Sequence, residues 1–191
     1  MSANLLTNPI AKFAFGFLNA WLLCLPLLIP GVFIAVVRKD VAKRMSDMTG
    51  YNAKEKFFTV AASLAPYPLM VLTVWTPFTP RRVLFACGMA VYLLGIAALF
   101  GTVYVFSQAP VDRPILTGPY RWSRNPLYVS AGLALLGICL VTANAVLFGI
   151  LVMLLVLQHF MILAEERACQ RKYGATYVQY ARTVPRYLGC I

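Results

Sequence analysis

The sequence predicts an all-α integral membrane protein with about five transmembrane helices. Hydrophobic residues make up 61% of its 191 residues and charged residues only 12%, whereas about a quarter of the residues of a soluble domain are charged. The apolar residues occur in long runs, and the positive charges gather in the segments between those runs. These observations together exclude an ordinary soluble domain.

Five apolar runs are candidates for membrane spans, because a helix needs about 20 residues to cross a hydrocarbon core of roughly 30 Å. The first run is too long for a signal-peptide core and shows no convincing cleavage site, so we interpret it as a mature span. We expect Pro26 and Pro30 to kink it. The predicted spans are Ile10–Val37, Phe57–Phe78, Val83–Phe106, Leu127–Val141 and Ala145–Leu163.

Two features of the sequence predict how these spans pack. Only Thr142–Asn144 separates the short fourth run from the fifth, which predicts a minimal turn and a tight helical hairpin. In the third run Gly88, Gly95 and Gly101 lack a side chain, and small residues let membrane helices approach closely. We therefore expect the third span to pack tightly against a neighbour.

The formal net charge of +11 is distributed unevenly along the chain. Placing Arg38–Lys56, Ser107–Pro126 and the tail from Glu165 on one side of the membrane collects 14 of the 17 lysines and arginines there. This asymmetry predicts an outside N-terminus and a cytoplasmic C-terminus. We therefore attribute the charge to topology and to anionic lipids, and no nucleic-acid partner is expected.

The chain is predicted to be a single membrane domain, residues 1–191, with two unlike parts. Residues 1–106 form a three-span scaffold without a polar cluster in its spans, and its loop Arg38–Lys56 suits a helix at the level of the headgroups. Residues 107–191 hold a polar loop, the hairpin and a helical tail. No metal site is predicted, because five scattered cysteines and a single histidine, His159, lack ligand spacing.

Polar and aromatic residues gather directly before the hairpin, at residues 118–128. Gly118 and the proline after it predict a turn, since glycine permits unusual torsions and proline fixes φ. Asn125 and Pro126 predict the start of a helix, with Asn125 as the cap and Pro126 at the first helical position. Both ends of the hairpin should therefore lie at one membrane face.

Arg121 and Arg124 lie on the approach to this helix, and Tyr128 lies just inside it. A helix start offers unpaired amide donors and a partial positive charge, which suit a carboxylate or phosphate ligand. The alternative remains open that Arg124 anchors a lipid phosphate, and that Tyr120, Trp122 and Tyr128 belong to an interfacial aromatic belt.

Two adjacent carboxylates, Glu165 and Glu166, follow the last apolar run, on the face where basic residues are favoured. We expect one of them to pair with Arg124 or Arg121 across the hairpin, which leaves the other available to a ligand. Adjacent residues project about 100° apart on a helix, so the two are expected to differ in role. A purely structural ion pair is the alternative.

Tyr173, Tyr177 and Tyr180 form an aromatic stripe on one face of the predicted tail helix, with a break near Gly174. A helix that follows a break can fold back over the site as a lid, although such a stripe can also serve packing alone. Gln158 and His159 are polar positions inside the last span. They are interpreted either as hydrogen-bonded helix contacts or as the lining of a tunnel for a substrate.

With these residues the chain resembles the superfamily of isoprenylcysteine carboxyl methyltransferases and phospholipid methyltransferases, in its short prokaryotic form. The ordered set of motifs around an apolar hairpin, over about residues 115–187, carries the resemblance. The matching motifs are Gly-Pro-Tyr-Arg at 118–121, Arg-Asn-Pro-Leu-Tyr at 124–128, Glu-Glu-Arg at 165–167, Tyr-Gly at 173–174, Tyr177, Tyr180 and Val-Pro-Arg at 184–186.

This resemblance implies S-adenosylmethionine-dependent methyl transfer at the cytoplasmic face of a bacterial inner membrane. The acceptor would be lipophilic and enter from the bilayer: an isoprenylcysteine-type carboxylate, a lipid headgroup or a thiol. The implied cofactor-binding residues are Gly118, Tyr120, Arg121, Arg124, Asn125, Pro126, Tyr128, Glu165, Glu166, Tyr177 and Tyr180. The implied catalytic residues are Arg124, Glu165, Glu166 and Arg186, and the acceptor-binding residues are Arg121, Gln158 and His159.

One position departs from the eukaryotic carboxyl methyltransferases, which usually have histidine where this chain has Asn125. Asparagine keeps the hydrogen bonds but does not titrate near neutral pH, so a proton-transfer role at this position is absent. Two other functions are kept as alternatives. One is an NADPH-dependent membrane reductase related to sterol reductases, and the other is a membrane scaffold or small transporter.

Overall fold

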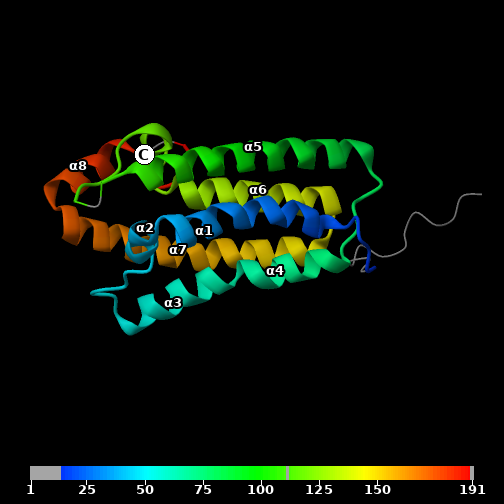
Figure 1. Cartoon of the computed structure of the whole chain (residues 1–191), viewed down its shortest axis with the longest axis horizontal. Helices are drawn as coiled ribbons and strands as arrows, with labels where there is room; N and C mark the ends of the chain where they lie inside the picture. Colours follow the sequence, from blue (N-terminus) through cyan, green and yellow to red (C-terminus); the bar gives the residue numbers. More distant parts are fainter. Residues whose placement is uncertain (1–13, 111, 190–191) are drawn as a thin grey trace, which may run out of the picture.

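The computed structural model describes residues 14–110 and 112–189. Throughout these residues the regular structure is helical, and the long helices run side by side along one axis (Figure 1). Four helical segments are long and apolar enough to cross a membrane, and the helix α6 (Pro126–Thr142) is apolar but shorter. The four segments are Ala20–Val37, Ala53–Trp75, Arg82–Gln108 and Ala145–Tyr173. The predicted all-α membrane fold is confirmed.

The first span consists of a 3₁₀ turn, η1 (Ala20–Cys24), followed by α1 (Leu25–Val37). Pro26 lies in the first turn of α1, where a missing amide donor costs little, so of the two expected kink positions only Pro30 is inside the helix. The predicted start at Ile10 lies outside the described residues. The helical part of the span begins ten residues later, at Ala20.

The short helix α2 (Lys39–Met45) follows α1, and the second span then begins at α3 (Ala53–Leu64). Asn52 caps α3 with a reciprocal pair of hydrogen bonds: its Oδ1 accepts from the Glu55 amide, and a Glu55 carboxylate oxygen accepts from the Asn52 amide. The proline at position 66 opens α4 (Pro66–Leu72), and η2 (Thr73–Trp75) completes the span.

The third span, α5 (Arg82–Gln108), packs against α6 with direct backbone contact. A Cβ atom on Gly95 would lie 2.4 Å from the backbone nitrogen of Ala134, and one on Gly137 would lie 2.5 Å from that of Tyr92. Gly88 is similarly close to α6. The expectation for Gly101 is wrong, because no atom of a neighbouring segment lies within 4 Å of a Cβ built there.

The predicted hairpin between α6 and α7 (Ala145–Tyr173) is confirmed. Ala143 adopts a left-handed conformation, with φ 51° and ψ 36°, and the Asn144 side chain accepts hydrogen bonds from the amides of Val146 and Leu147. The helix α7 continues ten residues past the predicted end at Leu163. Because its length of about 43 Å exceeds a hydrocarbon core of about 30 Å, its last turns form a polar extension of the hairpin.

The basic segments meet at one end of the bundle, where α2, the loop before α6 and the tail helix α8 (Ala175–Thr183) lie (Figure 1). The polar extension of α7 holds the loop between α2 and α3. Arg171 donates from Nη2 to the Gly50 carbonyl at 3.2 Å, and Arg167 forms an ion pair with Glu55. The N-terminal part thus supports the helix that carries both adjacent glutamates.

Candidate functional site

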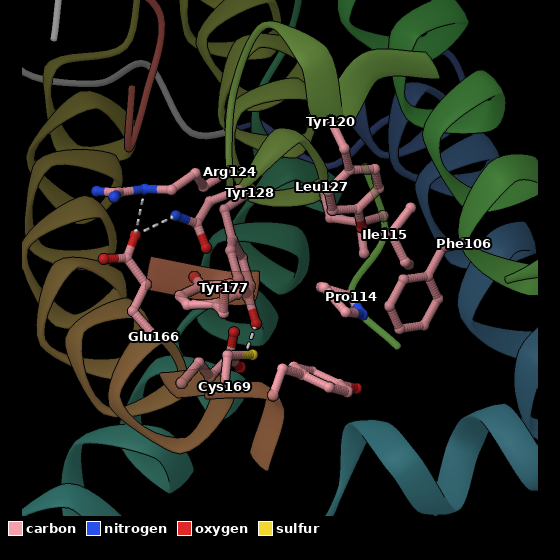
Figure 2. A pocket seen from close by; sticks show the side chains of 13 residues that line it. Phe106, Pro114, Ile115, Tyr120, Arg124, Leu127, Tyr128, Glu166, Cys169 and Tyr177 are labelled. Carbon is pink, nitrogen blue, oxygen red and sulfur yellow. Dashed lines mark hydrogen bonds and ion pairs between the residues drawn. The ribbon is translucent and has the colours of Figure 1, made fainter. Parts of the chain in front are cut away.

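A pocket opens where the end of α5, the loop before α6, the start of α6, the polar extension of α7 and α8 converge (Figure 2). We call it the polar pocket; its volume is about 120 Å³. Its lining residues are Phe106, Pro114, Ile115, Tyr120, Arg124, Asn125, Leu127, Tyr128, Glu165, Glu166, Cys169, Tyr173 and Tyr177. The structure therefore brings together the polar residues that flank the hairpin in the sequence.

Glu166 is the centre of a buried ionic cluster on one side of the polar pocket. Glu166 is only 6% exposed. Its Oε2 accepts hydrogen bonds from Arg186 Nε and Nη2 at 3.1 and 3.0 Å. Oε1 accepts from Asn125 Nδ2 at 2.9 Å. Arg124 Nε lies 3.3 Å from the same oxygen, an ion pair without hydrogen-bond geometry (Figure 2). The predicted pairing of one glutamate with Arg124 is thus present.

Asn125 does not cap α6 as predicted. It occupies the position before the first helical residue, but its side chain makes no capping hydrogen bond. Instead its amide donates to Glu166 and, at 3.2 Å, to the carbonyl of Arg186. The hydrogen bond to the buried Glu166 carboxylate is charge-assisted, and this long-range contact sets the orientation of the Asn125 side chain.

The segment Val184–Leu188, which we call the strap, is fastened to the residues before α6. The Arg124 amide donates to the Pro185 carbonyl at 2.9 Å, and the Ser123 hydroxyl donates to the Arg186 carbonyl at 3.1 Å. The hydrogen bond between Arg186 and Glu166 also raises the pKa of the arginine. Through these contacts the end of the chain closes one side of the polar pocket.

Glu165 projects differently from Glu166 and forms no ion pair with any described residue. Its Oε1 accepts a hydrogen bond from the Tyr128 hydroxyl at 2.6 Å, across the hairpin. The two glutamates therefore differ as the angle between adjacent helical residues predicts: Glu166 is neutralised by two arginines, and Glu165 presents a carboxylate to the pocket.

Two tyrosines of α8 lie under the strap and are buried. Tyr177 lines the polar pocket, whereas the Tyr180 hydroxyl donates to the Tyr120 carbonyl at 2.7 Å and holds α8 against the loop. Burial raises the pKa of both phenols well above the usual value for tyrosine, so both stay protonated. Within the aromatic stripe, Tyr177 thus lines the pocket and Tyr180 holds α8 in place.

A second, larger cavity of about 680 Å³ runs between α6 and α7 on the other side of Tyr128. We call it the apolar groove, because leucine, valine, isoleucine and phenylalanine side chains form most of its lining. Gln158, His159 and Tyr187 of the strap also line it, and His159 Nδ1 lies 2.8 Å from the Tyr187 hydroxyl. Tyr128 lines both cavities and so separates them.

Several residues expected in the cofactor site do not line the polar pocket. Arg121 is exposed and faces a separate surface hollow with Thr176 and Gln179. Gly118, at φ 60°, lies close to Val105, where a Cβ would meet a methyl carbon at 3.0 Å. The other two are Pro126, which is buried at the start of α6, and Tyr180. Arg186, expected as a catalytic residue, is also absent from the lining and reaches the pocket only through Glu166.

Six lining residues were not among the predicted site residues, although Tyr173 belongs to the predicted aromatic stripe and Leu127 to a matching motif. Cys169 and Tyr173 follow Glu165 at intervals of four residues, and this helical spacing could have identified them. Leu127 lies beside the predicted Tyr128. Phe106, Pro114 and Ile115 carry no recognisable signal, because their positions depend on the path of an irregular loop. Among the described residues, no group of three or more metal-ligating side chains lies close enough to hold a metal ion.

The family model for phospholipid methyltransferases matches residues 82–176. The match starts at α5 and ends in the first turn of α8, so it contains the whole hairpin and both glutamates. No curated protein and no solved structure matches the chain. The matched region is 95 of the 191 residues, just under half of the chain, and it holds motifs on both sides of the hairpin, so the resemblance of this chain to the phospholipid methyltransferase family, a family of membrane methyltransferases, is confirmed.

Proposed function

We propose that this protein transfers a methyl group from S-adenosylmethionine, bound in the polar pocket, to a lipophilic acceptor held in the apolar groove. The observation that carries the proposal is the position of Tyr128, which lines both cavities and donates a hydrogen bond to Glu165. A polar cofactor and an apolar acceptor can thus approach each other from opposite sides of one side chain.

The residues of the polar pocket fit such a cofactor. The Glu165 carboxylate can bind the cationic and hydroxyl groups of S-adenosylmethionine, and the tyrosine rings of the lining can stack on its base. In addition, Arg124 Nε is buried without a hydrogen-bond partner among the described residues. The pocket is smaller than the roughly 300–1,000 Å³ of typical ligand sites, so we expect α8 and the strap to move outward when the cofactor enters.

S-adenosylmethionine would supply an electrophilic methyl group to a lone pair of the acceptor, and its sulfur would keep the electron pair of the broken bond. The protein holds the acceptor in line and excludes water. Glu165 contacts the cofactor and takes any proton that the acceptor loses. Glu166, Arg124 and Arg186 act as positioning residues, because they bind one another in the structure.

A ligand-induced shift of the thermal midpoint tests the cofactor assignment. We expect S-adenosylmethionine and its demethylated product each to raise the midpoint of the purified protein, and Glu165→Gln to weaken both shifts. Asp40→Asn is the matched control, because Asp40 pairs only with Arg38 at the surface among the described residues. A midpoint shift with NADPH, without one for S-adenosylmethionine or its demethylated product, would establish a reductase instead.

We also propose that the end of the bundle with α2 and α8 faces the cytoplasm of a bacterial inner membrane, with the N-terminus outside. The uneven distribution of lysine and arginine supports this orientation, and the loop 38–56 is suited to anionic lipid headgroups. A fluorescent reporter that matures only in the cytoplasm, fused after Ile191, should be bright. A dark reporter on a folded, membrane-inserted protein would reverse the topology.

A further inference from the structure

A third hollow lies between the loop before α6 and the outer side of α8, at the end of the bundle where the basic segments meet. We call it the basic hollow; its volume is about 410 Å³. It shares no lining residue with the polar pocket or the apolar groove. Its lining residues are Leu116, Arg121, Thr176, Gln179, Tyr180, Thr183 and Val184. The proposed methyl transfer therefore gives this hollow no role.

The described lining of the basic hollow carries one positive charge, on Arg121, and no negative charge. Arg121 is exposed and forms no ion pair with any described residue. Across the hollow, Thr176 and Gln179 are exposed one helical turn apart on α8, and Thr176 lies in its first turn, where the partial charge of the helix favours an anion. A guanidinium that faces hydroxyl and amide donors is suited to a phosphate group.

The surroundings of the hollow suit a phosphate that belongs to a lipid. Trp122, next to Arg121, is 73% exposed, and Leu116 of the lining is 42% exposed. Tryptophan is enriched at the level of the headgroups, and an exposed leucine beside it can contact acyl chains. An ethanolamine headgroup would bring an ammonium group as well, for which the described lining offers no carboxylate. An anionic phospholipid therefore matches the charge of the hollow better than a zwitterionic one.

The basic hollow also lies across a joint of the structure. Its buried residue Tyr180 donates a hydrogen bond to the Tyr120 carbonyl at 2.7 Å, and this contact fastens α8 to the loop. Arg121 belongs to the loop, whereas Thr176 belongs to α8. A phosphate bound to both side chains would add a second connection between these two segments, outside the polar pocket.

We propose that the basic hollow binds the phosphate of an anionic phospholipid of the surrounding membrane through Arg121, Thr176 and Gln179, and that the bound headgroup holds α8 against the loop before α6. This lipid is not the methyl acceptor, which would occupy the apolar groove. The site goes beyond the proposed methyl transfer and does not depend on it. Because α8 also carries Tyr177 of the polar pocket, the lipid composition of the membrane would influence how readily the pocket opens.

Lipid retention by the full chain in detergent, measured by native mass spectrometry, tests the site. We expect Arg121→Gln to lower retention of dioleoylphosphatidylglycerol about three- to ten-fold, the range between an exposed ion pair and a hydrogen bond to a charged group. Retention of dioleoylphosphatidylethanolamine and of dioleoylglycerol should stay unchanged. Arg113→Gln is the matched control, because Arg113 is an exposed arginine of the same loop outside the lining. Thr176→Val is a second variant that keeps every charge, and it should weaken retention of the anionic lipid in the same direction.

Hydrogen exchange of the α8 amides tests the second part of the proposal. Dioleoylphosphatidylglycerol should slow this exchange in the unchanged chain and in Arg113→Gln, but not in Arg121→Gln. An equal loss of anionic lipid in Arg113→Gln, an equal loss of the ethanolamine lipid in Arg121→Gln, or retention without slower exchange would overturn the proposal. The same slowing by inorganic phosphate would overturn a lipid as the ligand. If retention depends on Arg121 while S-adenosylmethionine causes no thermal shift, the methyltransferase assignment fails and the lipid site stands.

Discussion

Tyr128 and Glu165, which are 37 residues apart in the chain, form a 2.6 Å hydrogen bond between the start of α6 and the polar extension of α7. This contact lies at the boundary between the polar pocket and the apolar groove. It fixes the one described carboxylate of the pocket that no arginine neutralises. The consequences of removing each partner differ and can be measured separately.

Tyr128→Phe should lower methyl transfer about 10- to 100-fold and lower the free energy of unfolding by up to about 1.5–3 kcal/mol, because that is what a hydrogen bond to a charged group contributes. The ring that separates the cavities remains in this variant. Initial rates with native membrane lipids and labelled cofactor measure the effect. Tyr104→Phe, at an exposed position of α5, is the control. Full activity in Tyr128→Phe would show that the hydroxyl has no part in the reaction.

Glu166→Gln should destabilise the protein by about 3–5 kcal/mol, because it leaves two arginines facing a buried site without their carboxylate. Thermal or denaturant unfolding in detergent measures this change. Glu165→Gln is the matched comparison, since it breaks no ion pair among the described residues, and it should alter cofactor binding more than stability. A Glu166→Gln protein as stable as the unchanged chain would contradict the structural role of the ionic cluster.

Gly132→Leu should block the apolar groove while cofactor binding is retained. Gly132 lines the groove on α6, and a Cβ there would lie 3.3 Å from Leu155 Cδ2, so a larger side chain must project into the groove. Retention of an oleoyl lipid by the protein in detergent, measured by native mass spectrometry, should fall to the background level. Gly149→Leu is the control, because no atom lies within 4 Å of a Cβ at this exposed position. Undiminished lipid retention in Gly132→Leu would place the acceptor elsewhere.

Gly95→Ala should reduce the yield of folded protein, because the new methyl group overlaps the backbone of α6 and the helices must separate. Overpacking typically costs about 1–3 kcal/mol, and contact with backbone atoms leaves little room for relaxation. Size-exclusion profiles and thermal midpoints after extraction measure the effect. Gly101→Ala should behave as the unchanged chain. Equal profiles for the two variants would contradict the close packing of α5 and α6.

Hydropathy and charge were sufficient to predict the helical membrane fold, the hairpin and the meeting of its two ends, because these depend on the length and polarity of continuous segments. Predictions made from neighbouring residues alone were wrong where contacts between distant segments decide the structure. Asn125 has the sequence context of a helix cap, yet its amide binds Glu166. Gly101 permits close packing, but no partner helix is present there. The angle between adjacent residues predicted different roles for Glu165 and Glu166, but only three-dimensional contacts show which one the arginines hold.

Two consecutive side chains of the strap contact different cavities. Arg186 binds Glu166 beside the polar pocket, and Tyr187 binds His159 beside the apolar groove. A backbone displacement that withdraws one of them therefore withdraws the other. Both products would leave after a single opening event, which favours a ternary-complex kinetic scheme in which cofactor and acceptor are bound together before either product departs. If the proposed methyl transfer takes place here, product release requires the strap to open, so a change that slows strap opening would lower turnover.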